Sequence, residues 1–263
     1  MKDQIRAGTA SIVYEQPITE RIRNFLRLEH LFQNINYAIA NPSAWGSREA
    51  IVTILELVDL LSRTDFKAEL IKELERHAAV LLALANKPGV DGSKLSDVTS
   101  RIEKVANRMK VAECQPTQRV RTDEFLNQVK QRVAIPGGAC NFDLPALHYW
   151  LSQPMHKRVA ELNTWMEDLR VIESAIDLVL MDIRQSTIPL AVTASGGFFQ
   201  QNIDASSPVL LLRVVLPADI AIFPEISGGK HRFTVRMMRQ ASSRERPEQV
   251  ECDVDFQLQC CGI

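Results

Sequence analysis

The chain has 263 residues; 46% of them are hydrophobic, 24% are charged, and the formal net charge is -1. This length suffices for one large hydrophobic core or two smaller ones, and the composition is that of an ordinary globular protein. Because general nucleic-acid binders usually carry a marked basic excess, the near-neutral charge argues against that class. Residues 1–11 contain no apolar signal segment, and no run approaches the ~20 apolar residues of a membrane span. We therefore expect a cytoplasmic protein that is neither exported nor inserted into a membrane.

The cysteines give no sign of a metal site or a disulfide framework. They are scattered along the chain, at Cys114, Cys140, Cys252, Cys260 and Cys261. No two have C-x-x-C spacing, and adjacent cysteines are poor ligands for one tetrahedral metal ion. We predict reduced thiols, no metal and no cofactor.

Up to about residue 187, hydrophobic residues recur at intervals of three and four, the spacing of amphipathic helices. Pro17 is expected to open the first helix, and Asn41-Pro42 to end it. Further helices are expected at 47–62, 66–86, 94–112 and 123–134, from Leu144, and, as one or two helices, from Pro154 to Gln185. About seven helices of this kind can form a core without help from strands.

Polar residues before these segments predict the helix N-caps. Thr64 or Asp65 is expected to cap the third helix, and Thr122 the fifth. Asp143 stands two residues before Pro145, and proline is well tolerated in a first helical turn. We therefore expect Asp143 to cap the short helix that follows.

After Pro189 the hydrophobic pattern changes from helical to alternating. Residues 209–216 read as a buried strand, and 230–237 and 250–260 alternate apolar with polar side chains. The polar segment 242–247 is expected to be the loop of a hairpin between the last two. A β-like run at 12–14 is expected to pair back into this sheet.

The sequence therefore predicts an α+β fold. Residues 1–16 are expected to hold a strand that belongs to the β domain, residues 17–187 an all-α helical domain, and residues 188–263 a small antiparallel β domain.

Segment 135–151 contains a glycine pair, Cys140, Asp143 and His148, which are ingredients of a nucleophilic site. Catalytic Cys/His pairs usually come from distant segments, and no third orienting residue is evident here. Pro136-Gly137-Gly138 is instead typical of a chain reversal in which glycine supplies a positive φ. We favour a turn into a helix and expect no catalytic residue; a cysteine-dependent enzyme is the less favoured alternative.

Basic residues carry the stronger functional signal. Lys230, Arg232 and Arg236 share the polar face of the strand expected at 230–237. Pairing with Asp253 and Asp255 on a neighbouring strand is an equally weighted structural explanation.

A second basic row lies on the first helix, where Arg23, Arg27 and His30 recur at i, i+4 and i+7. A merely solvated face explains it as well. Arg63 ends the second helix, where a cation suits the helix dipole. Guanidinium groups bind carboxylates and phosphates, so these rows suit an acidic peptide as well as a nucleic acid.

Segment 135–151 also resembles a known signature. Ile135-Pro136-Gly137-Gly138, Cys140, Phe142-Asp143-Leu144-Pro145, His148 and Trp150-Leu151 resemble the signature block of the ZapD family of bacterial cell-division proteins, also called YacF. Further matching segments are Tyr14-Glu15-Gln16-Pro17, Leu26-Arg27-Leu28-Glu29, Glu69 to Leu74, Ile183 to Ser186, Pro224 to Gly228 and Cys260-Cys261. The sequence departs from the family in its N-terminal residues, its 239–249 loop, its last two residues and the acidic Glu124.

This resemblance implies a helical domain followed by a β domain, homodimerisation and no enzymatic activity. It also implies binding to the C-terminal tail of FtsZ, the tubulin-like GTPase of the division ring at mid-cell. The basic positions that it implicates in docking are Arg27, Arg63, His148, Arg232 and Arg236, to which the strand pattern adds Lys230.

We therefore predict a non-enzymatic homodimer that binds FtsZ tails and bundles FtsZ filaments at the division ring. Two-fold symmetry would give each dimer two docking sites, and many weak tail contacts would add up through avidity. A basic-patch module that binds nucleic acid is the first alternative, although we expect no nucleic acid, and the cysteine-dependent enzyme is the second.

Overall fold

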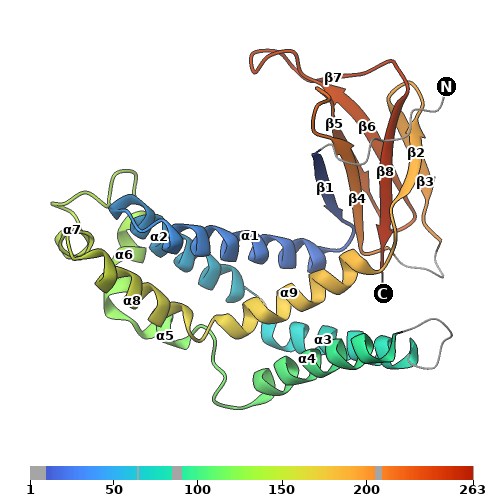
Figure 1. Cartoon of the computed structure of the whole chain (residues 1–263). Helices are drawn as coiled ribbons and strands as arrows, with labels where there is room; N and C mark the ends of the chain where they lie inside the picture. Colours follow the sequence, from blue (N-terminus) through green and yellow to red (C-terminus); the bar gives the residue numbers. More distant parts are fainter. Residues whose placement is uncertain (1–9, 64, 85–90, 205–208, 263) are drawn as a thin grey trace. The chain divides into compact units, whose positions relative to one another are not determined.

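The computed structural model describes residues 10–63, 65–84, 91–204 and 209–262. They form two compact units. Unit 1 comprises the described residues of Met1–Asn24 and Met181–Ile263, and unit 2 is Phe25–Leu180. Helices form unit 2, and unit 1 is built mainly of strands (Figure 1). This confirms the predicted α+β class.

Nine helices lie in the part of the chain that the structure describes. They are α1 (Glu20–Ala40), α2 (Ala44–Leu61), α3 (Phe66–Leu84), α4 (Gly92–Lys110), α5 (Gln118–Thr122), α6 (Glu124–Val133), α7 (Pro145–Leu151), α8 (Met155–Met166) and α9 (Arg170–Gln185). The periodicity predicted the ranges of the other helices within a few residues, with α8 and α9 expected as one or two helices, and missed α5. Helix α2 packs against α6, α7 and α8, and α3 packs against α4.

The start of α1 differs from the prediction. Pro17 does not open the helix; it is the last residue of an edge strand, where a missing amide donor is tolerated. The chain then turns, and the Thr19 hydroxyl accepts a hydrogen bond from the Ile22 amide at 3.3 Å. Helix α1 therefore begins at Glu20.

The predicted N-caps had mixed outcomes. Asp65 accepts a hydrogen bond from the Ala68 amide at 3.2 Å, as expected, whereas Thr64 lies outside the described residues. Thr122 was the wrong cap for α6, because it is the last residue of α5. Asp123 caps α6 instead, and its carboxylate accepts from the Leu126 amide at 2.9 Å.

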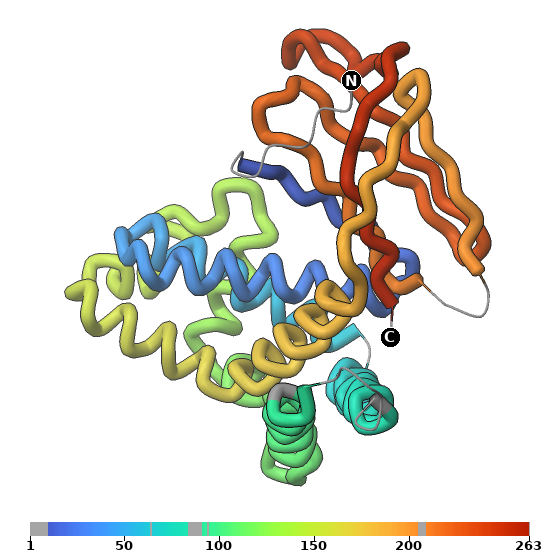
Figure 2. Tube along the Cα trace, turned by 45° about the vertical axis from the view of Figure 1, so that its right-hand side comes forward, coloured from blue at the N-terminus to red at the C-terminus, as the bar shows by residue number. Residues whose placement is uncertain are grey.

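Two antiparallel four-stranded sheets form most of unit 1. The strands are β1 (Ser11–Pro17), β2 (Leu190–Ala194), β3 (Phe198–Asn202), β4 (Leu211–Pro217), β5 (Phe223–Gly228), β6 (Arg232–Arg239), β7 (Glu248–Gln249) and β8 (Val254–Cys261). The first sheet has the order β1-β4-β8-β2; the second has the order β3-β6-β5, and β7 also pairs with β6. As expected, β1 joins the strands from the other end of the chain (Figure 2).

The predicted hairpin is wrong in part. Only the short β7 pairs back onto β6, with Met238 opposite Gln249. The Val250 amide still donates to the Met237 carbonyl on β6 at 2.9 Å, and residues 251–253 then lead to the first sheet. The strand expected from residue 250 therefore begins at Val254, in that sheet. Strands β2, β3 and β5 were not predicted.

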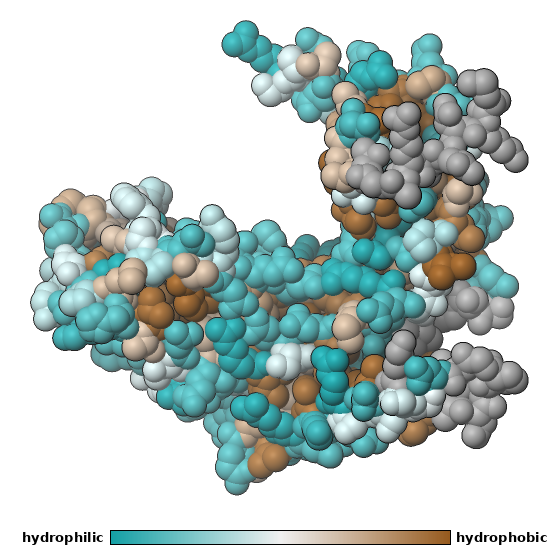
Figure 3. All heavy atoms as spheres, viewed as in Figure 1, coloured by the Kyte–Doolittle hydropathy of each residue, from teal (hydrophilic) through white to brown (hydrophobic). Residues whose placement is uncertain are grey.

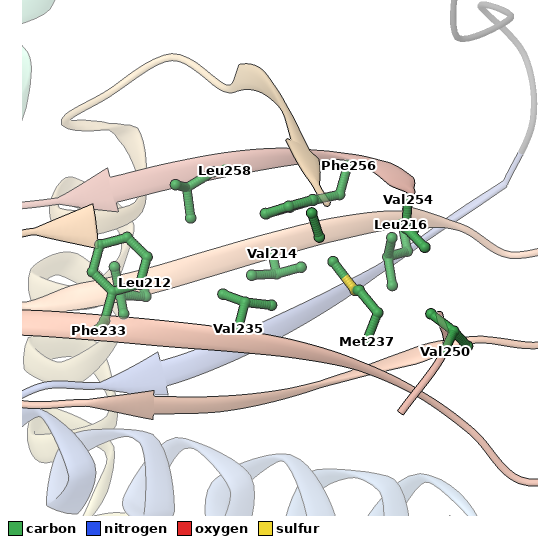
Figure 4. Packing of buried hydrophobic residues seen from close by; sticks show 11 residues of the cluster. Leu212, Val214, Leu216, Phe233, Val235, Met237, Val250, Val254, Phe256 and Leu258 are labelled. Atoms are coloured by element: carbon green, nitrogen blue, oxygen red, sulfur yellow. The ribbon is translucent and has the colours of Figure 1, made fainter. Parts of the chain in front are cut away.

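The two sheets pack face to face around one hydrophobic core (Figure 4). Alternate residues of β4 and β8 in the first sheet meet alternate residues of β6 in the second, as period-two side-chain geometry requires. The core includes Leu212, Val214, Leu216, Phe233, Val235, Met237, Phe256 and Leu258, which are at most 3% exposed. Because alternate side chains of β6 are held in this core, the side chains between them point to the outer face of the sheet.

A network of ion pairs and hydrogen bonds connects β1 to the end of α9 and to the neighbouring strands β4 and β8. The carboxylate of Glu15 accepts two hydrogen bonds from Arg184, at 2.7 and 2.8 Å, and one from Arg213 at 2.9 Å. Arg213 also donates to Gln259 on β8 at 2.7 Å. Burial alone would raise the pKa of Glu15, but the hydrogen bonds and charges of the two arginines outweigh it and hold the pKa below its ordinary value.

Candidate functional site

Strand β6 presents basic side chains on the surface of unit 1. Arg232 and Arg236 lie on its outer face, because the residues between them alternate into the sandwich core. Both side chains are exposed, and so is that of Lys230, which lies in the turn before the strand. These three predicted residues therefore follow one another along β6 and the turn before it, and we call them the β6 basic row.

The neutralising partner of this row is not the predicted one. Asp253 accepts a hydrogen bond from the Gly196 amide at 2.8 Å, and Asp255 accepts one from the Thr193 hydroxyl at 2.6 Å. Strand β8 lies in the other sheet, so the proposed cross-strand pairing is wrong. Arg236 instead forms a 3.1 Å ion pair with Glu225 on β5.

The ion pair between Arg236 and Glu225 leaves the β6 basic row largely available for binding a ligand. The side chains of Arg236 and Glu225 are 55% and 44% exposed, and solvent-exposed pairs of this kind contribute only ~0–1 kcal/mol. Within the described part of the chain, neither Lys230 nor Arg232 forms an ion pair. An acidic ligand could therefore bind the row at little cost in lost internal contacts.

The other predicted residues lie on unit 2. Arg27 is exposed on α1, beside the buried Phe25. Arg63 is exposed in the turn after α2, where its amide donates to the Leu60 carbonyl at 3.3 Å. His148 is exposed on α7. These three residues come from three different elements.

An aromatic cluster fixes α7. The rings of Phe125, Trp150 and Trp165 lie 5.8–5.9 Å apart, centroid to centroid. The Trp150 indole donates to the carboxylate of Glu161, and the Trp165 indole donates to Asp123 at 2.9 Å. The sequence analysis did not predict this cluster. Aromatic residues make up only 6% of the chain, so three of them on neighbouring helices are a signal that could have indicated it.

Asp123 holds two elements with its two carboxylate oxygens, one on the Leu126 amide and one on the Trp165 indole. We expect Asp123→Ala to lower the free energy of unfolding of unit 2 by about 1–2 kcal/mol, because it removes a helix cap and leaves an indole donor unpaired. Urea unfolding followed by tryptophan fluorescence measures this. Asp123→Asn keeps the capping oxygen and should lose only about half as much; equal losses for both variants would contradict this account.

The glycine pair before α7 makes the expected chain reversal. Gly137 has a φ of 74°, and the Gly138 amide donates to the Ile135 carbonyl at 2.8 Å. Positive φ is a region that glycine adopts without steric cost. The turn interpretation of this segment is therefore confirmed.

Asp143 is not the cap of α7, contrary to expectation. The N-cap is Leu144, which makes no side-chain capping bond, and Pro145 occupies the first turn as expected. The Asp143 carboxylate instead accepts from the Cys140 thiol at 3.5 Å, and the thiol also lies 2.7 Å from the Gly137 carbonyl. In the described residues no hydrogen bond joins Cys140 to His148, so the nucleophile–base pair gains no support.

Among the described residues, no group of three His, Cys, Asp or Glu side chains could hold a metal ion. No helix among these residues is long and apolar enough to cross a membrane.

Comparison with known proteins identifies the family. The profile of the family described as "ZapD: Cell division protein" matches residues 26–236. Cell division protein ZapD of Methylococcus capsulatus is 41% identical over 250 residues, which cover 95% of this chain and 98% of the relative. Its counterparts in Coxiella burnetii and Cronobacter sakazakii are 33% and 36% identical, over 96% and 95% of this chain and 98% of each relative. These relatives are named as cell division proteins rather than as enzymes, and the chain belongs to the ZapD family of cell division proteins.

Proposed function

We propose that this protein binds the C-terminal tail of FtsZ and, as a cytoplasmic homodimer, bundles FtsZ filaments at the division ring without catalysing a reaction. Membership of a cell division family supports the process. The observation that carries the docking mechanism is the β6 basic row, an exposed set of cations on a strand whose inner face is locked into the sandwich core.

The chemistry of this row suits an acidic peptide. A guanidinium group binds a carboxylate through two parallel hydrogen bonds, and Arg232 and Arg236 present two such groups from one rigid strand. Lys230 adds a third positive charge beside them. We assign accessory contacts to Arg27, Arg63 and His148 on unit 2, which are also exposed.

Bundling would follow from symmetry. A two-fold dimer has two equivalent docking sites, and each can hold a tail from a different filament. Because filaments carry many tails, individually weak contacts become strong through effective concentration. Exposed charges are screened beyond ~10 Å at 0.1 M salt, so we expect bundling to weaken as ionic strength rises.

The test is co-sedimentation with FtsZ polymers. We expect Arg232→Glu/Arg236→Glu to reduce binding at least tenfold, because the charge reversal repels an acidic tail. Arg244→Glu, an exposed arginine in the loop between β6 and β7, is the matched control and should bind as the wild type does. Arg244→Glu should unfold at the wild-type temperature. The double variant should stay folded with a small loss of stability, because Arg236→Glu exchanges an exposed ion pair with Glu225 for an exposed like-charge pair. FtsZ without its tail should not retain the protein. Wild-type co-sedimentation by a folded double variant would refute this docking face.

A further inference from the structure

The outer face of the second sheet carries an aromatic side chain beside the β6 basic row. In the antiparallel register, Phe198 of β3 lies opposite Arg236, and Asn202 lies opposite Arg232. Residues that lie opposite each other in a sheet share one face, and their Cβ atoms are ~4.5–5.5 Å apart. Phe198 and Arg236 are therefore neighbours on one continuous surface, which the strand register itself establishes.

The two consecutive phenylalanines of β3 point in opposite directions. Phe199 packs against the sandwich core, where its ring centroid lies 6.2 Å from that of Phe233 and 5.5 Å from that of Phe256. Phe198 therefore points away from the core, and it is 41% exposed. Figure 3 shows apolar residues in brown among polar ones in teal on the visible side of unit 1, so exposure alone does not distinguish Phe198. Its place beside Arg236 does.

The two sides of β6 differ in charge. On the β5 side, Glu225 lies opposite Arg236 and pairs with it at 3.1 Å. On the β3 side, the outward residues are uncharged: Phe198, Gln200 and Asn202. The carboxylate of Glu225 repels an acidic ligand, whereas the outer face of β3 does not. A ligand carboxylate therefore reaches Arg236 from the β3 side, next to the ring of Phe198.

The spacing of the arginines sets a pattern for the ligand. Arg232 and Arg236 are four residues apart on β6. At ~3.4 Å per residue, their Cα atoms are separated by roughly 13 Å. An extended peptide along β6 turns every second side chain to the same side, so it matches both arginines with carboxylates at positions i and i+4. The same-side residues next to the carboxylate at Arg236 then lie ~7 Å from it, within reach of the Phe198 ring.

We propose that Phe198 forms an apolar subsite of the β6 basic row, which binds an acidic peptide with a large apolar side chain within two residues of the carboxylate at Arg236. The proposal rests on the proposed function, in which the FtsZ tail is that peptide, and it adds a requirement that charge alone does not impose. The positive charges select acidic peptides, and burial of apolar surface against the ring selects among them. Single-stranded nucleic acid is disfavoured, because its binding proteins combine a basic groove with several stacking rings and this chain has a net charge of -1.

The test is peptide binding by the full chain, measured by fluorescence anisotropy. Two labelled peptides carry aspartate at i and i+4, and differ in having leucine or serine two residues from each aspartate. We expect the wild type to bind the leucine peptide about tenfold more tightly than the serine peptide, because only leucine buries apolar surface on the ring. Phe198→Thr, which keeps a residue type favoured in strands, should abolish this preference and leave binding of the serine peptide within about twofold of the wild type.

Two further variants serve as controls. Phe198→Leu keeps an apolar side chain and should retain most of the preference for the leucine peptide. Leu190→Ala, which truncates a 61% exposed residue on β2 in the first sheet, should bind both peptides as the wild type does. The proposal is overturned if the wild type does not distinguish the peptides, or if folded Phe198→Thr still prefers the leucine peptide. It is also overturned if Phe198→Thr weakens binding of labelled oligothymidine but not of the leucine peptide.

Co-sedimentation with FtsZ polymers separates this proposal from the proposed function. If the wild type shows the peptide preference, Phe198→Thr loses it, and the wild type does not bind FtsZ, the apolar subsite stands and the proposed function fails. If Arg232→Glu/Arg236→Glu loses FtsZ binding while Phe198→Thr binds FtsZ and both peptides as the wild type does, the proposed function stands and the apolar subsite fails.

Discussion

Arg158→Ala is expected to lower the free energy of unfolding of unit 2 by about 3–5 kcal/mol. The side chain is only 7% exposed and donates to three backbone carbonyls and one hydroxyl. Alanine would leave these acceptors without their donor; the Ser47 hydroxyl is fully buried and the three carbonyls are partly buried. Each unsatisfied buried group costs ~1–3 kcal/mol. The variant would also release the turn between α1 and α2 from the turn between α7 and α8.

The chain offers a spectroscopic readout and two matched controls for Arg158. All three tryptophans, Trp45, Trp150 and Trp165, lie in unit 2, so fluorescence-detected urea unfolding reports on that unit. Lys157→Ala, at the exposed neighbouring position, should change stability by less than ~0.5 kcal/mol. Arg158→Lys should recover a minority of the loss, because an ammonium group cannot reproduce the planar fork of a guanidinium group. An alanine variant within 1 kcal/mol of the wild type would show that these hydrogen bonds are replaced by water.

The sequence predicted the elements whose buried faces leave a clear period. Helices α1 and α2 carry long apolar stripes, and their ranges were found within a few residues. Helix α5 has five residues and one buried side chain, Val120, which is too little to generate a period. Strands β2 and β3 escaped prediction because most of their residues are exposed, so the alternation that marks a half-buried strand is absent.

For the candidate site, the sequence predicted the direction of side chains but not their partners. Period-two alternation correctly placed Arg232 and Arg236 on one face of β6. The predicted pairing with Asp253 and Asp255 is wrong, because strands that are adjacent in the sequence need not be neighbours in one sheet, and β8 lies in a different sheet from β6. A local sequence pattern also cannot show that a particular apolar side chain is exposed to solvent. The exposure of Tyr149 follows from the opposite face of α7, which the aromatic cluster buries.

In unit 1, Glu15→Gln is expected to lower the free energy of unfolding by about 2–4 kcal/mol at pH 7. Hydrogen bonds to charged groups contribute ~1.5–3 kcal/mol, and the glutamine would remove the negative charge that Arg184 and Arg213 share. The Glu15 side chain is 19% exposed, so solvent offsets part of this loss. Glu225→Gln, which removes an exposed carboxylate from its pair with Arg236, should cost no more than ~1 kcal/mol.

The stability lost in the Glu15→Gln variant should become smaller as the pH falls. The pKa of Glu15 in the folded protein lies below its ordinary value of 4.5, so folding favours the ionised carboxylate. Its contribution is therefore fully present above pH 4.5 and is lost as the pH falls through the folded pKa. The stability difference between the wild type and Glu15→Gln should be constant near neutral pH and shrink under acid conditions. Hydrogen exchange of the β4 and β8 amides measures the stability of unit 1, while the tryptophan signal of unit 2 should not change. A difference that stays constant down to pH 3 would mean that the Glu15 carboxylate is not what stabilises this sheet.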